Sequence, residues 1–168
     1  METMNERIRQ YIQEHKTEMV DLWKTLVNTE SGSYQKEGVT RVAHIIGDEL
    51  ADAGLEVRYE QSENAGDTLI AETTTGKGMA PILFIGHMDT VFKEGAAAKN
   101  PFRIDEKDCA HGPGVLDMKG GLVIAVYAIK ACLDAGYNRR PIKCVFAPDE
   151  EIMHAKSNVK HILSREAE

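Results

Sequence analysis

The chain has 168 residues, a length that fits one domain over residues 1–168 and allows a substantial apolar core. Its 20 basic and 27 acidic residues give a net charge of -7, which argues against nucleic acid or an anionic membrane as a partner. Hydrophobic residues make up 42% of the chain, and no apolar run approaches the ~20 residues of a membrane span. A soluble protein that acts on a small molecule or a metal is expected.

The N-terminal residues are charged and amphipathic and lack the apolar core of a secretory signal, which favours the cytoplasm. Three cysteines, Cys109, Cys132 and Cys144, do not have the spacing of a disulfide framework or a thiolate zinc site. Each is therefore predicted to be a small buried residue.

The first half of the chain predicts two helices and two strands. Apolar residues at three- and four-residue steps indicate one amphipathic helix over residues 4–28. The SGS sequence at 31–33 breaks this pattern, and a second helix follows until Gly54 ends it. Alternating residues at 55–60 and 67–74 are typical of strands.

The second half predicts a strand, a helix and a strand. Residues 81–86 form a short continuous apolar run typical of a strand covered on both faces, and 141–148 form another. Between them, residues 120–136 are apolar nearly all round, as in a buried helix. This order indicates parallel pairing of the two strands, with helices on both faces of an α/β sheet.

The polar residues with the most chemical interest follow the two apolar strands. His87 and Asp89 lie directly after the first strand, at the edge where open α/β sheets bind ligands. A neutral imidazole binds zinc, and a carboxylate that accepts its other N–H orients the ring. Glu150 and Glu151 follow the second strand and point in different directions. Each pair alone is also compatible with an ordinary hydrogen-bonded or solvated turn.

A glycine-rich segment, GPGVLDMKGG (112–121), leads into the predicted buried helix and carries Asp117. The backbone N–H groups and dipole at a helix N-terminus favour an ionised carboxylate there. A phosphate-binding loop and a plain helix N-cap are the alternatives, although neither GxxxxGK[ST] nor GxGxxG is present. Because His87, Asp117, Glu150 and Glu151 converge on one edge, a metal site is predicted.

Four segments occur in the order and approximate spacing of the M20 metallopeptidase family: GHMDTVF (86–92), PFRID (101–105), GPGVLDMKGG (112–121) and PDEE (148–151). The chain resembles the carboxypeptidase G2-like glutamate carboxypeptidases of this family. The resemblance implies a three-layer α/β/α zinc-peptidase-like (phosphorylase/hydrolase-like) catalytic domain with a mixed, mostly parallel sheet. It implies that the chain is the truncated, N-terminal portion of that domain. It also implies that the lid or dimerisation domain is absent, through which full-length members often form homodimers.

The resemblance also implies roles for single residues. His87 is expected to bind one zinc ion, Asp117 to bridge two, and Glu151 to bind the other. Asp89 is expected to orient His87, and Glu150 to act as the general base that moves a proton from water to the leaving nitrogen. Two Zn2+ per complete site, with Co2+ able to substitute, would polarise the carbonyl group. The implied substrate is an N-acyl amino acid or small peptide, with release of a C-terminal glutamate as one option.

The resemblance also concerns one peptide bond, the type of nucleophile and two residues that depart from the family pattern. A cis peptide bond is implied between Asp117 and Met118. A serine or cysteine nucleophile fits poorly because no GxSxG elbow is present. Met153 stands where a glycine is frequent, and His111 stands where an aromatic or small residue is common.

The family pattern requires two further ligands, an acidic residue and a histidine, after Glu151. His154 and His161 are predicted to face solvent, and Glu166 and Glu168 to lie at a surface helix end, so none is assigned as a ligand. The expected protein is a hydrolase fragment with very low activity alone. A non-catalytic metal-binding remnant and one half of a partner-completed enzyme are the alternatives. An exposed sheet edge is also expected.

Overall fold

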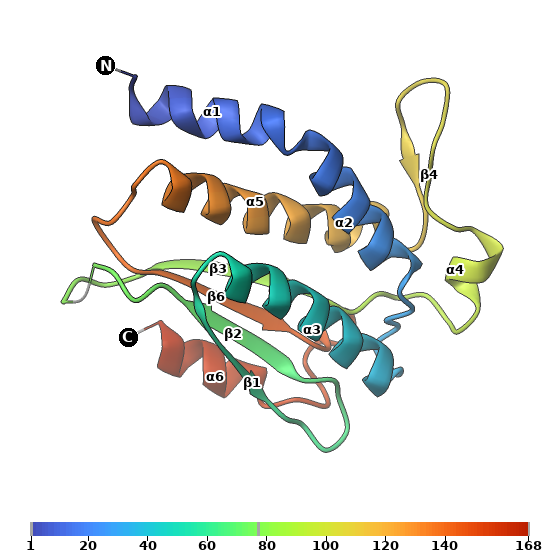
Figure 1. Ribbon diagram of the computed structural model, residues 1–168. Helices are drawn as coiled ribbons and strands as arrows, with labels where there is room; N and C mark the ends of the chain where they lie inside the picture. Colours follow the sequence, from blue (N-terminus) through green and yellow to red (C-terminus); the bar gives the residue numbers. More distant parts are fainter. Residues whose placement is uncertain (1, 77, 168) are drawn as a thin grey trace.

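The computed structural model describes residues 2–76 and 78–167 of the chain. Its helices and strands follow one another along the chain as shown in Figure 1. They are α1 (Met4–Glu14), α2 (Lys16–Asn28), α3 (Lys36–Asp52), β1 (Glu56–Glu60), β2 (Thr68–Glu72), β3 (Ile82–His87), α4 (Ala96–Lys99), β4 (Arg103–Ile104), β5 (Ala110–His111), α5 (Gly121–Asp134), β6 (Ile142–Ala147) and α6 (Val159–Glu166). Two short turns, η1 (Val115–Gly120) and η2 (Glu150–Ile152), precede α5 and follow β6.

The main sheet has the strand order β1-β2-β6-β3 and is mixed, as predicted. Strands β3 and β6 are parallel and are joined through α5, which confirms the predicted strand–helix–strand unit. The prediction of a mostly parallel sheet is wrong for these strands, because β1 pairs antiparallel with β2, and β2 antiparallel with β6. Parallel neighbours need a long crossover, whereas the connection from β1 to β2 only reverses the chain.

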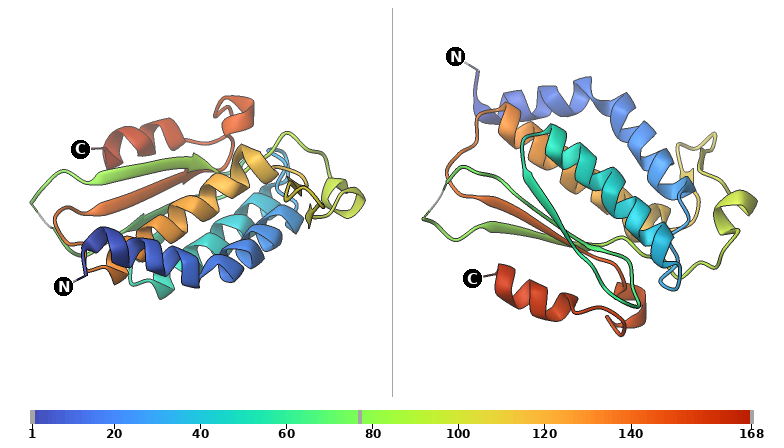
Figure 2. Two further views of the ribbon diagram at one scale, coloured as in Figure 1. Left: turned by 90° about the horizontal axis from the view of Figure 1, so that it is seen from above. Right: turned by 60° about the horizontal axis from the view of Figure 1, so that its bottom comes forward.

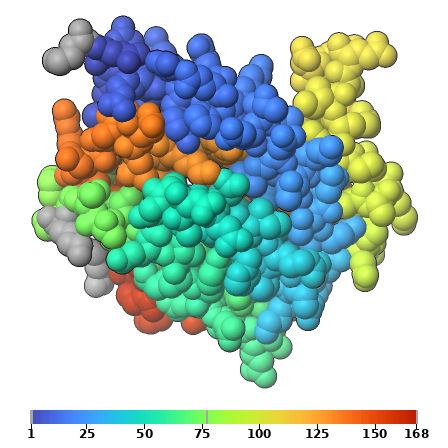
Figure 3. Space-filling model, viewed as in Figure 1, coloured from blue at the N-terminus to red at the C-terminus, as the bar shows by residue number. Residues whose placement is uncertain are grey.

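Helices lie on both faces of this sheet, giving the expected three layers. Figure 2 shows α6 on one face and the other long helices on the opposite face. The larger core lies under α2, α3 and α5 and includes Leu26, Ile46 and Phe146. The smaller core lies under α6, where Val159 and Ile162 pack near Ile70 and Val145. In Figure 3, α1, α2 and α3 form most of the visible surface, with α5 showing between them.

The single helix predicted over residues 4–28 is interrupted at His15, where α1 ends and α2 begins. The His15 ring stacks on Tyr11, and its Nδ1 lies 2.8 Å from the Tyr11 carbonyl oxygen. The bend lets α1 pack along α5 while α2 reaches the η1 turn. Periodic apolar residues are present on both sides of the bend, so the sequence pattern alone did not reveal it.

The cysteines differ in burial. Cys144 is buried in β6, and burial raises its pKa to about 12. Cys132 is half-buried, but Cys109 is exposed, so the prediction of burial is wrong for that residue. Cys109 lies in the β4–β5 hairpin, whose strands are only two residues long and carry little apolar surface.

The acidic end of α6 was predicted to face solvent, but Glu166 is only 5% exposed. Its carboxylate lies beneath the sheet among Arg58 of β1, Lys143 of β6 and Arg165. We call these four residues the Glu166 ion cluster. The helical pattern was correct, but the side chain turns toward basic residues that are distant in sequence. Glu168 lies outside the described residues.

The strand β3 is at one end of the strand order and pairs only with β6 among the described residues. Its other edge is therefore unpaired in this part of the chain, as expected. Within residues 2–76 and 78–167, no helix combines the length and the apolar content that crossing a membrane requires.

Candidate metal centre

His87 is the last residue of β3, and it lies opposite Ala147, the last residue of β6. Because the two strands are parallel and in this register, the segments that follow them leave the sheet at the same edge. Glu150 and Glu151 begin the η2 turn just beyond β6. The sheet thus brings the two predicted segments together, as the sequence indicated.

Asp117 reaches the same place from the η1 turn, whose backbone is not helical at Asp117 and Met118. The peptide bond between these residues is cis, as the resemblance implied. Gly114 has a φ of 67°, a conformation that favours glycine, and its carbonyl accepts a hydrogen bond from Lys119 N at 3.0 Å. Gly120, not Asp117, occupies the N-cap position of α5, so the alternative of Asp117 as a plain N-cap is wrong.

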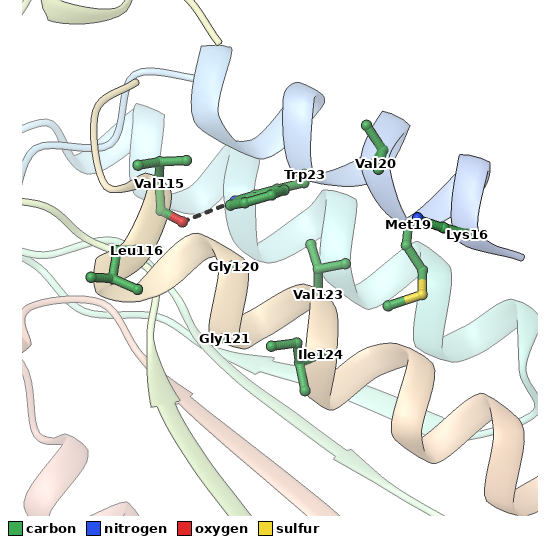
Figure 4. A pocket seen from close by; sticks show the side chains of 10 residues that line it. All are labelled: Lys16, Met19, Val20, Trp23, Val115, Leu116, Gly120, Gly121, Val123 and Ile124. Atoms are coloured by element: carbon green, nitrogen blue, oxygen red, sulfur yellow. Dashed lines mark hydrogen bonds between the residues drawn. The ribbon is translucent and has the colours of Figure 1, made fainter. Parts of the chain in front are cut away.

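Two long side chains tie the η1 turn to α2. Trp23 Nε1 donates to the Val115 carbonyl oxygen at 2.9 Å, the bond drawn in Figure 4. Lys119 Nζ donates to the Thr29 carbonyl oxygen at 2.8 Å. Lys119 is almost completely buried, and this burial lowers its pKa to about 8. Sequence reasoning missed both contacts because neither Trp23 nor Lys119 lies in a motif that indicates such a distant partner.

His87, Asp117 and Glu151 meet at one point. Each offers a ligand atom, and these atoms all lie within 4.8 Å of one another. His87 Nε2 is 3.0 Å from Asp117 Oδ1 and 4.0 Å from Glu150 Oε2. The Glu150 side chain is half-exposed, so it can face a ligand in solution. We call His87, Asp89, Asp117, Glu150 and Glu151 the metal-site cluster.

Asp89 connects the two strand ends. It is fully buried, and its Oδ1 lies 3.3 Å from His87 Nδ1. The same carboxylate accepts hydrogen bonds from Glu150 N at 3.0 Å and Glu151 N at 3.2 Å. One buried carboxylate therefore fixes both the imidazole and the start of the η2 turn.

Ser33 completes this arrangement by donating from Oγ to Asp89 Oδ2 at 2.6 Å. The backbone of its segment also pairs with the chain after Asp89, since Thr90 N donates to Ser31 O and Ser33 N donates to Thr90 O. Sequence reasoning treated residues 31–33 only as a helix break. A hydroxyl between two helices is too common to have identified Ser33 as a partner of Asp89.

The charges of this cluster are unbalanced. Burial of His87 disfavours its charged form, but hydrogen bonds to Asp89 and Asp117 outweigh burial and raise its pKa to about 9. For Glu151, burial and the nearby charges of Asp117, Asp89 and Glu150 raise the pKa, despite an opposing contribution from His87. Several carboxylates around one imidazole repel one another, and a cation would relieve that repulsion. An imidazole nitrogen with carboxylate oxygens is also a donor set that zinc accepts.

The two histidines after Glu151 differ from each other. His161 is exposed, as predicted. His154 was predicted to face solvent, but its side chain is only 19% exposed and its Nδ1 is buried. His154 borders a cavity of about 330 Å³ that is also lined by His87, Asp117 and Glu150. The prediction is wrong because the chain after η2 folds back toward the sheet.

A larger apolar cavity of about 450 Å³ lies between α2 and the start of α5. Figure 4 shows that Trp23, Val123 and Ile124 line it. None of the metal-site cluster borders this cavity. The cavity beside His87 borders three members of the metal-site cluster, His87, Asp117 and Glu150, and can combine a metal with a bound molecule. A further cavity of about 450 Å³ borders Glu151 but no other member of the cluster.

The model for peptidase family M20/M25/M40 matches residues 83–167, which contain η1, α5, β6, η2 and all of β3 except its first residue, Ile82. Carboxypeptidase G2 from Pseudomonas sp. (strain RS-16) is 35% identical over 129 residues, which are 75% of this chain and 31% of that protein. Acetylornithine deacetylase from Pasteurella multocida is 31% identical over 116 residues, 67% of this chain and 30% of that protein. The chain thus spans about a third of the length of these curated relatives.

Solved structures show the same fold. The dipeptidase Dug1p from Saccharomyces cerevisiae matches 95% of this chain and 37% of its own, with a TM-score of 0.78 and 16% identity. Human carnosine dipeptidase 1 matches 98% of this chain and 38% of its own, with a TM-score of 0.75 and 22% identity. Since the family model covers half of the chain, and includes every member of the metal-site cluster, the chain belongs to peptidase family M20/M25/M40, a family of hydrolases.

Proposed function

We propose that the metal-site cluster binds divalent metal through His87, Asp117 and Glu151 and serves the hydrolysis of an amide bond. The observation that carries the proposal is the convergence of three ligand atoms within 4.8 Å, with buried Asp89 fixing the elements that supply two of them. The repulsion among the carboxylates supports the same conclusion, because a bound cation would offset it.

Two Zn2+, or Co2+ in their place, would when bound polarise the scissile carbonyl group and lower the pKa of the attacking water. His87, Asp117 and Glu151 would hold the metal. Asp89 keeps the His87 ring oriented from the opposite side. Glu150 takes the proton of the attacking water and delivers it to the leaving amide nitrogen. The half-exposed Glu150 carboxylate lies 4.0 Å from His87 Nε2, which supports its access to a molecule beside the metal.

We propose an N-acyl amino acid or a small peptide as the substrate. The names of two relatives, a carboxypeptidase and an acetylornithine deacetylase, support an amide adjoining an amino acid. Release of a C-terminal glutamate, by analogy with the first relative, is the narrower form of this proposal. The net charge of -7 supports a small substrate over nucleic acid or an anionic membrane. The proposed location is the cytoplasm.

A second candidate is metal binding without turnover, or turnover only when a partner chain, such as a second copy, supplies further ligands. The three ligand atoms that converge in the described residues are compatible with this candidate as well. Zinc binding is expected for all of these candidate functions. Hydrolysis is the property that separates them.

The metal proposal is tested by zinc titration with calorimetry and by metal analysis after dialysis. We expect the wild-type chain to retain zinc, and His87→Ala to lose affinity by more than the ~10–100-fold typical of an orienting residue. His161→Ala is the matched control, since His161 is exposed and should leave zinc affinity unchanged. A wild-type chain that binds no zinc at saturation would overturn the proposal.

The role of Glu150 is tested by Glu150→Gln in an assay of N-acyl amino acid hydrolysis. The variant should retain zinc but lose about 10²–10⁴-fold in rate, the usual contribution of a positioned base. Full activity in this variant would remove Glu150 as the base. Zinc binding with no hydrolysis by the wild-type chain, alone or mixed with a candidate partner, would favour the non-catalytic alternative.

A further inference from the structure

We propose that His154 binds the carboxylate of the molecule that occupies the metal-site cavity, a molecule that also carries an apolar side chain. The proposal rests on the proposed function, because it names the class of ligand for the same cavity. It adds a residue that neither the family pattern nor the set of candidate metal ligands includes.

His154 belongs to the cavity by position. It follows the η2 turn, and its ring lines the space of about 330 Å³ that His87, Asp117 and Glu150 also border. Its nitrogens are not part of the group of ligand atoms formed by His87, Asp117 and Glu151. His154 therefore faces the space beside the metal rather than the metal position itself.

The backbone holds His154 in this place, beside a buried acid. Met153 and His154 have φ values of 60° and 56°, a left-handed conformation that is unfavourable for residues with a Cβ. His154 N donates to the Asp149 carbonyl oxygen at 2.9 Å, and His154 Nδ1 lies 3.5 Å from Asp149 Oδ1. Asp149 is fully buried and is itself fixed by hydrogen bonds from Lys156 N, Ser157 N and Ser157 Oγ. The backbone thus places His154 at the border of the cavity, and its buried Nδ1 has no hydrogen-bond partner among the described residues.

The other polar groups of the cavity do not suit an anion. Asp117 and Glu150 are acidic, so they would repel a carboxylate. Among the described residues that line the cavity, only His87 and His154 carry a side-chain nitrogen. His87 is engaged on both ring nitrogens, by Asp89 and by Asp117. His154 is the remaining side-chain donor for an oxygen of a bound molecule.

The remaining walls suit an apolar group. They consist of apolar or small residues from β3, the η1 turn, β6 and α6, namely Ile85, Gly86, Met118, Ala147 and Leu163. An amino acid joins a carboxylate to a side chain by one carbon, so a leucine-like residue could reach His154 and these walls together. The cavity volume of about 330 Å³ is also within the range of small-ligand sites.

The test uses 4-methylpentanoate, which has the leucine side chain and a carboxylate but no amide to hydrolyse. 4-Methylpentanamide is the matched neutral probe. Imidazole C–H resonances of the zinc-loaded chain are followed by NMR during titration with each probe, with the His154 signal assigned from His154→Gln. We expect the His154 signal to shift with the carboxylate and to stay in place with the amide.

Affinity provides the second measurement. Loss of one charge-assisted hydrogen bond should make His154→Gln bind 4-methylpentanoate about tenfold more weakly. Binding of the amide, and the amount of zinc per chain, should not change. His161→Gln serves as the control for replacing a histidine that does not border the cavity.

Unchanged affinity of His154→Gln for the carboxylate would overturn the inference, because the anion would then be held by zinc alone. An equal shift of the His154 signal with both probes would overturn it as well, since His154 would then serve a neutral oxygen. Loss of zinc in His154→Gln would make His154 a metal ligand instead. A wild-type chain that binds no zinc overturns both the inference and the proposed function, whereas zinc binding without probe binding overturns the inference only.

Discussion

Two groups of charged side chains lie on the sheet, and they differ in their balance of acidic and basic groups. In the metal-site cluster, four carboxylates surround the single imidazole of His87. In the Glu166 ion cluster, the Glu166 carboxylate contacts Arg58, Lys143 and Arg165. Two neighbouring carboxylates also pair with these basic side chains, Glu72 with Lys143 and Glu60 with Arg165. The first group has carboxylates in excess, whereas every carboxylate of the second group contacts a basic side chain. Only the first group gains from an added cation, which distinguishes a candidate metal site from a structural ion cluster.

The pKa shifts follow the same difference. Burial would raise the pKa of Glu166, but hydrogen bonds from Arg58, Lys143 and Arg165 outweigh burial and lower the pKa to about 2. In the metal-site cluster, burial and neighbouring carboxylates raise the pKa of Glu151. A carboxylate whose ionised form is already stabilised needs no metal, whereas one whose ionised form is disfavoured is stabilised by one.

The largest effect is expected for Asp89→Ala. Removal of this buried carboxylate leaves Glu150 N, Glu151 N and Ser33 Oγ without their acceptor, at about 1–3 kcal/mol for each unsatisfied group. We expect a loss of about 3 kcal/mol or more in unfolding free energy, measured by urea denaturation. Asp89→Asn keeps one acceptor oxygen, should fold, and should bind zinc about 10–100-fold more weakly. Wild-type zinc affinity in Asp89→Asn would show that Asp89 does not orient His87.

A smaller loss of stability is expected for Glu166→Ala. Breaking a buried ion pair costs about 3–5 kcal/mol, but Arg58 and Arg165 are nearly half-exposed and Lys143 keeps a contact with Glu72. We therefore expect Glu166→Ala to lower the unfolding free energy by about 2 kcal/mol, measured by urea denaturation. Zinc affinity should not change, because the Glu166 ion cluster shares no residue with the metal-site cluster. Exposed Glu18→Ala is the control, and a zinc defect in Glu166→Ala would contradict the separation of the two clusters.

Acid should weaken the same ion cluster by less than truncation does, because a protonated Glu166 still fills its place. Since the folded pKa of about 2 is below the ordinary value of 4.5, the contribution of Glu166 is complete above pH 4.5 and is lost as the pH falls through 2. Thermal unfolding between pH 6 and 2 should show a smaller decrease in Tm for Glu166→Gln than for wild type. Parallel curves for the two proteins would contradict this expectation.

The sequence predicted those parts of the fold and site that depend on local pattern. Apolar runs identified β3, α5 and β6, and the residues directly after them include His87, Asp117, Glu150 and Glu151. The antiparallel pairing of β2 with β6 was missed, because an apolar strand does not specify the direction of its neighbour. The bend at His15 and the burial of Glu166 were missed because each depends on packing against distant elements.

The supporting contacts of the site were missed for the same reason. Ser33 is 56 residues from Asp89, and Lys119 is 90 residues from Thr29. Neither residue lies in a sequence motif that identifies its hydrogen-bond partner, because hydroxyl and ammonium groups can bond to many different groups in a protein. Residues that carry chemistry are thus easier to predict from sequence than the residues that hold them in place.

Ser33 gives the smallest and most specific test of that distinction. Ser33→Ala removes one neutral donor from the Asp89 carboxylate, and we expect a loss of about 1 kcal/mol in unfolding free energy. Ser31→Ala is a matched control, since Ser31 Oγ is equally buried but has no hydrogen-bond partner among the described residues. Ser31→Ala should lower the unfolding free energy by less than Ser33→Ala does in the same urea denaturation. If Ser33 acts on the metal through Asp89, only Ser33→Ala should also weaken zinc binding, by less than Asp89→Asn does. Equal zinc affinity in both serine variants would confine Ser33 to a structural role.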